Sequence, residues 1–261
     1  MVHNTSITQR TDYEHAREVA REIGRIYSTL SAEGIAELAG ILIPVKYQKG
    51  EVVLPEGEVC RYMYYVQKGL VRQYYYKNGK EMTEHFSYEG RIVMCIESLF
   101  TGRPSRLIIG TLENTVLWAI PIDAFQRLLE HHMELNELYR RILEHALISS
   151  QWHADAQRFE RAADRYERLL EQYPELILRA PMHMIASYLQ MTPETLSRIR
   201  NKVYTLKSGA SFTALMTLSI SSSVRYGAMG SESASSAQRS VTGKSPSTIP
   251  FMASCLWGGT G

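Results

Sequence analysis

The stretch "LVRQYYYKNGKEMTEHFS", residues 70–87, contains two strand-forming runs with a short turn between them. Val and Tyr are common in β-strands, and Asn78-Gly79 can adopt positive φ at both central positions of a two-residue turn. We therefore predict a β-hairpin with strands over residues 70–76 and 81–86.

The hairpin belongs to a longer segment, about residues 41–121, that has the same pattern of strand-forming runs and turns. Short runs rich in Val, Ile and Tyr alternate with glycine turns at a spacing typical of a β-sandwich or barrel. Helical spacing precedes this segment over residues 12–39 and follows it over residues 123–173. The expected class is α+β, with an N-terminal β-roll of the jelly-roll type. The glycines that mark the turns are Gly50, Gly57, Gly69, Gly79, Gly90 and Gly102.

A long helix is predicted after the β segment, over about residues 134–153, because apolar residues recur there at a three-four spacing. Its broad apolar stripe could pack against the chain's own sandwich, or it could form a dimer seam, and both interpretations stay open. The stripe consists of Leu135, Leu138, Ile142, Ala146 and Ser149, with Tyr139, Leu143, Leu147 and Ser150 beside them.

Another helix is predicted over residues 159–172, where arginines alternate with acidic residues. Alternating charge of this kind is typical of a solvated helix face with weak surface ion pairs. Pro174 is expected to end the helix. Beyond Tyr204, Ser, Thr, Gly and Ala dominate and Glu232 is the only acidic residue. We interpret this tail as mostly disordered, or as non-native sequence from a shifted reading frame.

Composition excludes several classes of protein. The 261-residue chain has a net charge of +2, so affinity for nucleic acid must come from a local patch. Its three cysteines, Cys60, Cys95 and Cys255, are far apart, which suits a reducing cytoplasm, and no metal site is expected. Long uncharged apolar runs are absent, so no membrane span is expected. Hydrolase, phosphate-loop and zinc-protease motifs are absent too, so we expect no enzymatic activity and no catalytic residues.

The stretch "PMHMIASYLQMTPETLSRIRNK", residues 181–202, contains two short helical patterns with a tight break between them. Thr192 can cap the second helix, and Pro193 fits its first turn. Two short helices joined in this way match a helix-turn-helix, in which the second helix enters the DNA major groove. The plainer alternative is a helical hairpin with a polar outer face. The first helix has its apolar stripe at Met182, Ile185, Ala186 and Leu189.

The polar face of the second helix carries residue types that read bases. Arg198 can donate two hydrogen bonds to guanine, and Glu194 can accept one from cytosine N4. From Arg179 to Lys207 the only acidic residue is Glu194, and the local basic excess would supply the attraction to phosphates. The basic residues counted in this excess are Arg179, Arg198, Arg200, Lys202 and Lys207. The predicted DNA contacts are Thr192, Glu194, Thr195, Ser197, Arg198, Asn201 and Lys202.

The order of β-roll, long helix and helix-turn-helix resembles the Crp/Fnr transcription regulators. "YLQMTPETLSRIR" is similar to the recognition segment of that family, where a Glu-Thr pair precedes an Arg. "GEVVLPEGEVCRYMYYVQKGLVRQYY" resembles the cyclic-nucleotide-binding roll, and "RYERLLEQYPEL" looks like the branch common in Bacteroidetes. Gln190 stands where the family usually has Gly, so a side chain must tolerate a left-handed backbone there.

The resemblance also implies an effector site, in which a Glu holds the ribose hydroxyl and an Arg holds the phosphate. Ile96 replaces the usual Gly before Glu97, and "RPSRLII" replaces the usual Arg-Ser-Ala. These departures favour a different small effector, or none, over conventional cyclic AMP binding. Two cysteines in the roll are too few for an iron–sulfur cluster, and no residue is marked as a haem ligand. The implied effector residues are Glu97, Ser98, Ser105 and Arg106.

We therefore predict a dimeric, sequence-specific transcription regulator of the Crp/Fnr type, controlled by a cyclic nucleotide or another small effector. The predicted domains are a sensor roll (residues 1–130), a dimerisation helix (131–157), a winged-helix-type helix-turn-helix (158–204) and a tail (205–261). Its expected partners are double-stranded DNA, a second copy of the chain and RNA polymerase, without a membrane. The alternative is a ligand-binding module that regulates a protein partner without binding DNA.

Overall fold

The computed structural model describes residues 3–207 of the chain, and the side chains of residues 13–203. The predicted tail lies outside the described residues beyond Lys207, and so does any wing that would follow the second helix of the motif. None of the described helices has the length and apolarity that a bilayer crossing needs.

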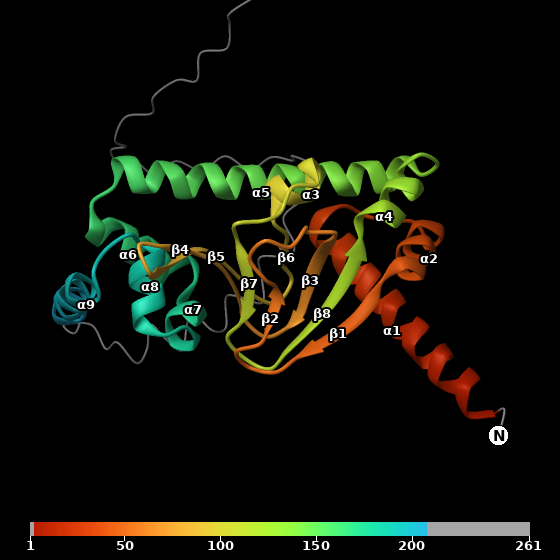
Figure 1. Cartoon of the computed structure of the whole chain (residues 1–261), viewed down its shortest axis with the longest axis horizontal. Coiled ribbons are helices and arrows are strands. Elements are labelled where there is room, and N and C mark those ends of the chain that lie inside the picture. The colour runs from red at the N-terminus through yellow and green to blue at the C-terminus, as the bar shows by residue number, and fades with distance from the viewer. Residues whose placement is uncertain (1–2, 208–261) are drawn as a thin grey trace, which may run out of the picture. The chain divides into compact units, whose positions relative to one another are not determined.

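Eight strands form two four-stranded antiparallel sheets, which confirms the mixed α and β class with a jelly-roll-like β domain (Figure 1). We call this β domain the roll. One sheet has the order β1 (Ile43–Tyr47), β8 (Thr115–Pro121), β3 (Tyr62–Lys68) and β6 (Ile92–Val93). The other has the order β2 (Val52–Leu54), β7 (Ile108–Thr111), β4 (Val71–Lys77) and β5 (Lys80–Ser87).

The predicted hairpin is β4 and β5, with each strand boundary one residue from the prediction. Asn78 and Gly79 have φ of 52° and 72°, and the pair Lys77 and Lys80 closes the turn. Both central residues therefore take the left-handed conformation that a two-residue hairpin turn requires.

Nine helices are described, and three of them come before the last strand. The helices are α1 (His3–Tyr27), α2 (Ala32–Ile41), α3 (Ile96–Thr101), α4 (Ile122–Leu129), α5 (Met133–Phe159), α6 (Ala162–Gln172), α7 (Pro174–Arg179), α8 (Met182–Tyr188) and α9 (Pro193–Lys207). The sequence pattern missed α7: Pro174 begins this helix as well as following the end of α6, because proline fits a first helical turn.

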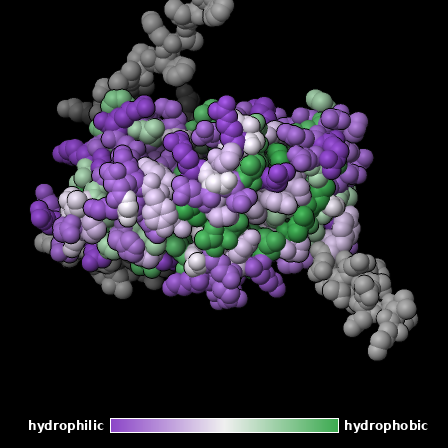
Figure 2. Space-filling model, viewed as in Figure 1, coloured by the Kyte–Doolittle hydropathy of each residue, from purple (hydrophilic) through white to green (hydrophobic). Residues whose placement is uncertain are grey.

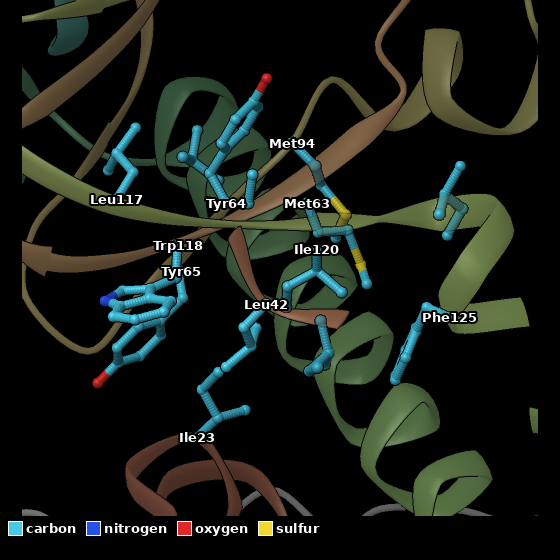
Figure 3. Close-up of a cluster of buried hydrophobic side chains, with 14 of the residues drawn as sticks. Ile23, Leu42, Met63, Tyr64, Tyr65, Met94, Leu117, Trp118, Ile120 and Phe125 are labelled. Atoms are coloured by element: carbon cyan, nitrogen blue, oxygen red, sulfur yellow. The ribbon is translucent and has the colours of Figure 1, made fainter. Parts of the chain in front are cut away.

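The main core lies where the β1–β8–β3–β6 sheet meets the surrounding helices (Figure 3). Trp118 and Phe125 are almost fully buried, and Ile23 of α1 packs into the same cluster. The indole N–H of Trp118 donates to the Gln67 side chain at 2.9 Å, so the buried ring keeps a partner for its polar group.

Helix α5 has two apolar faces, one buried against the roll and one exposed. Leu135, Leu138 and Ile142 are buried against the chain's own roll, which confirms the packing interpretation for these residues. A different set, which includes Trp152 and Phe159, is 62% and 80% exposed. In the view of Figure 2, hydrophilic residues cover the end that carries α6 to α9, whereas hydrophobic surface gathers over the roll strands.

Candidate nucleic-acid interface and effector cavity

Helices α8 and α9 meet at a tight turn that is held by backbone hydrogen bonds. The N–H of Gln190 donates to Ser187 O at 3.0 Å, and the N–H of Met191 donates to Ala186 O at 3.0 Å. Gln190 has a φ of 52°, so the predicted left-handed conformation is confirmed at the position where a side chain is disfavoured.

The start of α9 is capped as the sequence predicts. Thr192 Oγ1 accepts from the backbone N–H of Thr195 at 3.2 Å, and Pro193 is the first residue of the helix. The backbone N–H of Glu194 and the Thr192 side chain both hydrogen-bond the Glu194 carboxylate, which lowers its pKa. Glu194 therefore stays ionised at neutral pH and acts only as an acceptor.

The structure brings all the predicted DNA contacts together on the first turns of α9 and its cap. On the opposite side, Leu196 and Val203 are buried in the cluster that joins α9 to α6 and α8. The buried side fixes the helix, so the polar side is presented to solvent. Thr192, Glu194, Arg198, Asn201 and Lys202 are exposed, and Thr195 and Ser197 are half-buried.

Arg179 does not belong to this surface, contrary to the prediction that counted it among the phosphate-binding residues. Its guanidinium donates to Glu89 at 2.8 Å and to Glu113 at 2.7 Å, both carboxylates of the roll. These hydrogen bonds, first those to Glu113 and then those to Glu89, raise the pKa of Arg179. The basic excess near α9 therefore rests on Arg198, Arg200 and Lys202.

Helix α6 also departs from the predicted solvated face. Arg161 and Asp164 form an exposed ion pair as expected, but Arg165 turns inward and donates to Leu189 O at 3.0 Å. Arg168 pairs with Glu160 at 2.5 Å. Arg165 therefore fastens α6 to the residue that follows α8.

The effector residues implied by the resemblance lie on α3 and the loop after it. Glu97 and Arg106 stand 3.8 Å apart, with side chains 73% and 87% exposed, so solvent screens this ion pair. Ser98 Oγ accepts from Cys60 N at 2.9 Å and donates to Arg103 O at 2.6 Å. The Ser105 hydroxyl hydrogen-bonds the backbone of Leu107, so both serines hold the loop in place.

A cavity of about 160 Å³ lies between the β4–β5 side of the roll, α5 and the C-terminal helices. A second cavity of about 250 Å³ lies beside it, against α6, and both are lined by Ser149, Tyr173 and Tyr188. Typical ligand pockets have about 300–1,000 Å³. Either cavity alone therefore suits a small ligand, or a larger one that separates the elements around it.

Arg91 and His145 form the polar centre of the smaller cavity. Arg91 Nη1 donates to His145 Nε2 at 2.7 Å, and Nη2 donates to Tyr88 OH at 3.3 Å. Burial, and next the charge of Arg91, lower the pKa of His145, which keeps its ring neutral and able to accept. Within the described residues, no group of three or more His, Cys, Asp or Glu side chains converges in a way that could hold a metal ion.

The larger cavity adjoins a contact between the roll and the C-terminal helices, which we call the joint. The ring of His153 from α5 stacks on the ring of Tyr188 from α8, with the ring centroids 4.5 Å apart. The ring centroid of His85 from β5 lies 5.6 Å from that of His153. Burial, followed by the charge of His85, lowers the pKa of His153 to about 4. The joint consists of Thr83, His85, Phe86, Glu89 and Glu113 of the roll, His153 of α5, and Arg179, Ser187 and Tyr188.

Sequence reasoning missed Gln73, Arg91 and the joint residues other than Arg179 as parts of a site, and it assigned Arg179 to the surface of α9. Gln73 is buried in the smaller cavity and donates to Met94 O at 3.0 Å. The sequence offered one signal for this site, which is that His145 and His153 could share a face of α5. It offered no other, because the partners of these two residues come from distant parts of the chain.

Comparison with known proteins agrees with this architecture. Residues 44–132 match the family model described as the cyclic nucleotide-binding domain. The roll therefore resembles a cyclic nucleotide-binding domain. Over 149 residues the chain is 24% identical to the cAMP-dependent protein kinase regulatory subunit of Blastocladiella emersonii. The aligned part is 56% of this chain but spans only 37% of that relative.

Solved structures share the fold of about two thirds of this chain. FixK2 from Bradyrhizobium japonicum has a TM-score of 0.56 and 22% identity, covering 64% of this chain and 86% of its own. The c-di-GMP-responsive regulator CLP from Xanthomonas campestris has a TM-score of 0.53 and 18% identity, and the match covers 67% of this chain and 92% of CLP. A protein from Eubacterium rectale assigned to the Crp/Fnr family has a TM-score of 0.53 and 16% identity, covering 70% and 87%.

Proposed function

We propose that the protein is a dimeric, sequence-specific DNA-binding regulator without enzymatic activity, controlled by a small effector. The observation that carries the proposal is the exposed polar face of α9. Glu194 and Arg198 stand one turn apart on this face, directly after the Thr192 cap and the tight turn from α8. The order of cyclic nucleotide-binding domain, long helix and paired helices supports the same conclusion.

In this proposal α9 enters the major groove with its first turns at the base edges. Arg198 donates two hydrogen bonds to a guanine, and the ionised Glu194 accepts one from a cytosine N4 amino group. Lys202 and Arg200 contact phosphates, which fixes the register of the helix on the duplex.

The second copy of the chain is proposed to pack on the exposed face of α5. Ile148, Trp152 and Phe159 lie on one side of this helix by their spacing and are 49%, 62% and 80% exposed. Pairing of two copies would place the two α9 helices in successive major grooves, about 34 Å apart, on a near-palindromic site. A dimer bound in this way would act on RNA polymerase.

The test is selection of bound duplexes from a random pool by the purified full chain. We expect an enriched near-palindrome that the Glu194→Ala/Arg198→Ala variant no longer selects. The matched control is Arg161→Ala/Asp164→Ala, which also removes one exposed acid and one exposed base, but at the start of α6 and its N-cap. Loss of the motif in both double variants, or selection of the same motif by the first one, would contradict the proposed readout.

We also propose that the effector enters the cavity that contains Arg91 and His145. The half-buried guanidinium of Arg91 can hold an anionic group, whereas the more exposed Arg106 is screened by water. Thermal unfolding with a panel of cyclic mononucleotides, a cyclic dinucleotide and inorganic phosphate would identify a stabilising compound. Its effect should disappear in Arg91→Gln and persist in Arg106→Gln; the reverse result would return the site to the position implied by the family resemblance.

The second candidate function is a ligand-binding module that regulates a protein partner without binding DNA. The similarity to a kinase regulatory subunit favours this alternative. Salt separates the two functions, because the logarithm of DNA affinity falls with the logarithm of salt concentration by about 0.9 for each phosphate contacted. A selected duplex whose affinity did not depend on salt would favour the protein-partner function.

A further inference from the structure

We propose that the larger cavity is a second ligand site, which takes a small flat carboxylate or phosphate monoester. This cavity of about 250 Å³ lies between α5 and α6 and is bounded by the end of α8. Its cations come from α6, whereas the cation of the smaller cavity is Arg91. The site therefore does not depend on the effector proposed above, and it does not depend on DNA binding.

The walls of the larger cavity are one face of α5 and one face of α6. Each wall is a set of residues at positions i, i+3, i+4 and i+7, so the four side chains of a set lie on the same face of their helix. The buried part of the walls is apolar and consists of Ala156 and Leu169. The full sets are Ser149, Trp152, His153 and Ala156 on α5, and Arg165, Arg168, Leu169 and Gln172 on α6.

Two half-buried guanidiniums from α6 make this cavity positively charged. Arg165 donates through Nε to Leu189 O at 3.0 Å and through Nη1 to Glu160 O at 2.7 Å. Both acceptors are backbone carbonyl oxygens, so these two bonds leave the charge of Arg165 without a paired carboxylate. Arg168 pairs with the Glu160 carboxylate. Among the described residues that line the cavity, none is acidic.

Both guanidiniums keep N–H donors for a ligand. A guanidinium carries five N–H groups, and the bonds above use two on Arg165 and one on Arg168. Arginine binds carboxylate and phosphate groups through pairs of such donors. The positive charge also acts on His153: after burial and the charge of His85, the charges of Arg168 and Arg165 lower its pKa. An oxyanion would therefore be attracted to the place where a protonated imidazole is repelled.

The shape of the cavity suits a ligand with a single ring. Trp152, Tyr173 and Tyr188 all line it, and aromatic rings pack favourably against one another in stacked or edge-to-face arrangements. Trp152 also belongs to the face proposed for the second copy, and its 62% exposure places it at the open side of the cavity. A volume of about 250 Å³ is below the range of about 300–1,000 Å³ that is usual for drug-sized ligands.

The test measures binding of benzoate and phenyl phosphate to the full chain by tryptophan fluorescence and by equilibrium dialysis. Both anions should change the fluorescence of Trp152 as they bind. Benzamide, which has nearly the same shape as benzoate but no charge, should bind at least about tenfold more weakly. Acetate, which has the charge but no ring, should also bind more weakly. In Trp152→Phe the fluorescence change should disappear while dialysis still detects benzoate.

Substitutions of arginine test which cation holds the anion. Arg168→Gln should weaken benzoate binding at least about tenfold, because a charge-assisted hydrogen bond is lost. Arg168→Lys keeps the charge and should lose less. The matched control is Arg161→Gln, which removes an exposed cation from the N-cap of α6 and should change the affinity less than about twofold. Arg91→Gln should likewise leave benzoate binding unchanged, which separates this site from the smaller cavity.

Ligand binding should also be detectable at the turn between α8 and α9. Arg165 holds Leu189 O, and Leu189 directly precedes Gln190 in that turn. A ligand that contacts both α5 and α6 should stabilise the closed arrangement of these helices. Hydrogen exchange should therefore slow in α6 and in the turn when benzoate is added, and it should stay unchanged in β3.

Four results would overturn the proposal. The first is equal binding of benzoate and benzamide. The second is the same loss of affinity in Arg161→Gln as in Arg168→Gln. The third is a loss in Arg91→Gln alone, which would place the anion in the smaller cavity and favour the effector site proposed above. The fourth is no binding of either aromatic anion at millimolar concentration. The comparison of benzoate with benzamide uses the wild-type chain, so it decides the matter even if Arg168→Gln fails to fold.

Discussion

The core of the roll and the joint are held together by different kinds of contact. In the core, large apolar side chains such as Trp118 and Phe125 are buried almost completely. In the joint, Arg179 binds two carboxylates, Ser187 Oγ accepts from Thr83 N at 2.9 Å, and His153 stacks on Tyr188. The core depends on burial, whereas the joint adds directional and charged contacts to the apolar packing of Leu70 and Phe86 against the C-terminal helices.

This difference indicates which part of the molecule can respond to conditions. Apolar burial has no direction and is nearly independent of pH and moderate salt. Ion pairs and neutral buried imidazoles change with both. The joint is therefore the region where an effector or a change of solution can alter how α8 and α9 are held, provided that it binds the alternative states with different affinity.

The largest expected effect is in the core. Phe125→Ala removes a fully buried ring that packs edge-to-face on Tyr139 at 5.6 Å, and it should lower the free energy of unfolding by about 3–5 kcal/mol. Urea denaturation measures the loss. Phe100→Ala, which truncates a ring 49% exposed on α3, is the control and should cost less than about 0.5 kcal/mol. Equal losses in the free energy of unfolding for the two variants would contradict the claim that burial of Phe125 stabilises the core.

The next effect is in the joint. Arg179→Ala should weaken the attachment of α7 and α8 by about 1–3 kcal/mol, because Glu89 and Glu113 lose a charged donor. Hydrogen exchange should quicken in these helices and stay unchanged in β3. In Arg179→Lys, exchange in α7 and α8 should be faster than in wild type and slower than in Arg179→Ala, since a single ammonium cannot reproduce the contact of a guanidinium with two carboxylates. Arg161→Ala, which ends an ion pair within α6 only, is the control. Faster exchange throughout the roll would contradict the separation of the two regions.

The pH dependence of the joint follows from His153. Its folded pKa of about 4 lies below the ordinary value of 6.5, so the unfolded chain binds the extra proton first. Stability is therefore present above pH 6.5 and is lost as the pH falls from 6.5 to 4, by about 3 kcal/mol. A protonated ring would face the cations of Arg165 and Arg168 and the neighbouring His85. Equilibrium unfolding of wild type and His153→Phe, which keeps a ring on Tyr188, measures the effect; an identical pH slope in both would contradict it.

The smallest effect is expected from Ser187. Ser187→Ala leaves the backbone N–H of Thr83 without its acceptor and should cost about 0.5–1.5 kcal/mol. Hydrogen exchange of the Thr83 amide should quicken more than that of the amides in β4. If Ser187→Ala cost as much as Arg179→Ala, hydrogen bonding and not charge would dominate the joint.

The sequence predicted the parts of this comparison that depend on local physics. The Asn78-Gly79 turn, the Thr192 cap and the left-handed Gln190 each follow from residues within a few positions. The three-four spacing likewise predicted the buried side of α5 at Leu135. Such signals survive because propensity and tertiary packing agree at these positions.

The remainder depends on contacts between distant residues. Arg179 meets Glu89, 90 positions away, and nothing within its own helix predicts that it turns toward the roll. For the same reason the cavity that contains Arg91 and His145 was missed, since these residues are 54 positions apart. The short α7 was also missed, because a six-residue helix has too few turns to show a period.

The measurement that tests the central claim most directly compares the affinity of wild type and Arg198→Ala for the selected duplex and for random DNA. We expect Arg198→Ala to cost about 1–3 kcal/mol on the selected site, to relax the preference at one base pair and to change binding to random DNA little. Equal losses on both duplexes would reduce Arg198 to a phosphate contact and contradict base reading by α9.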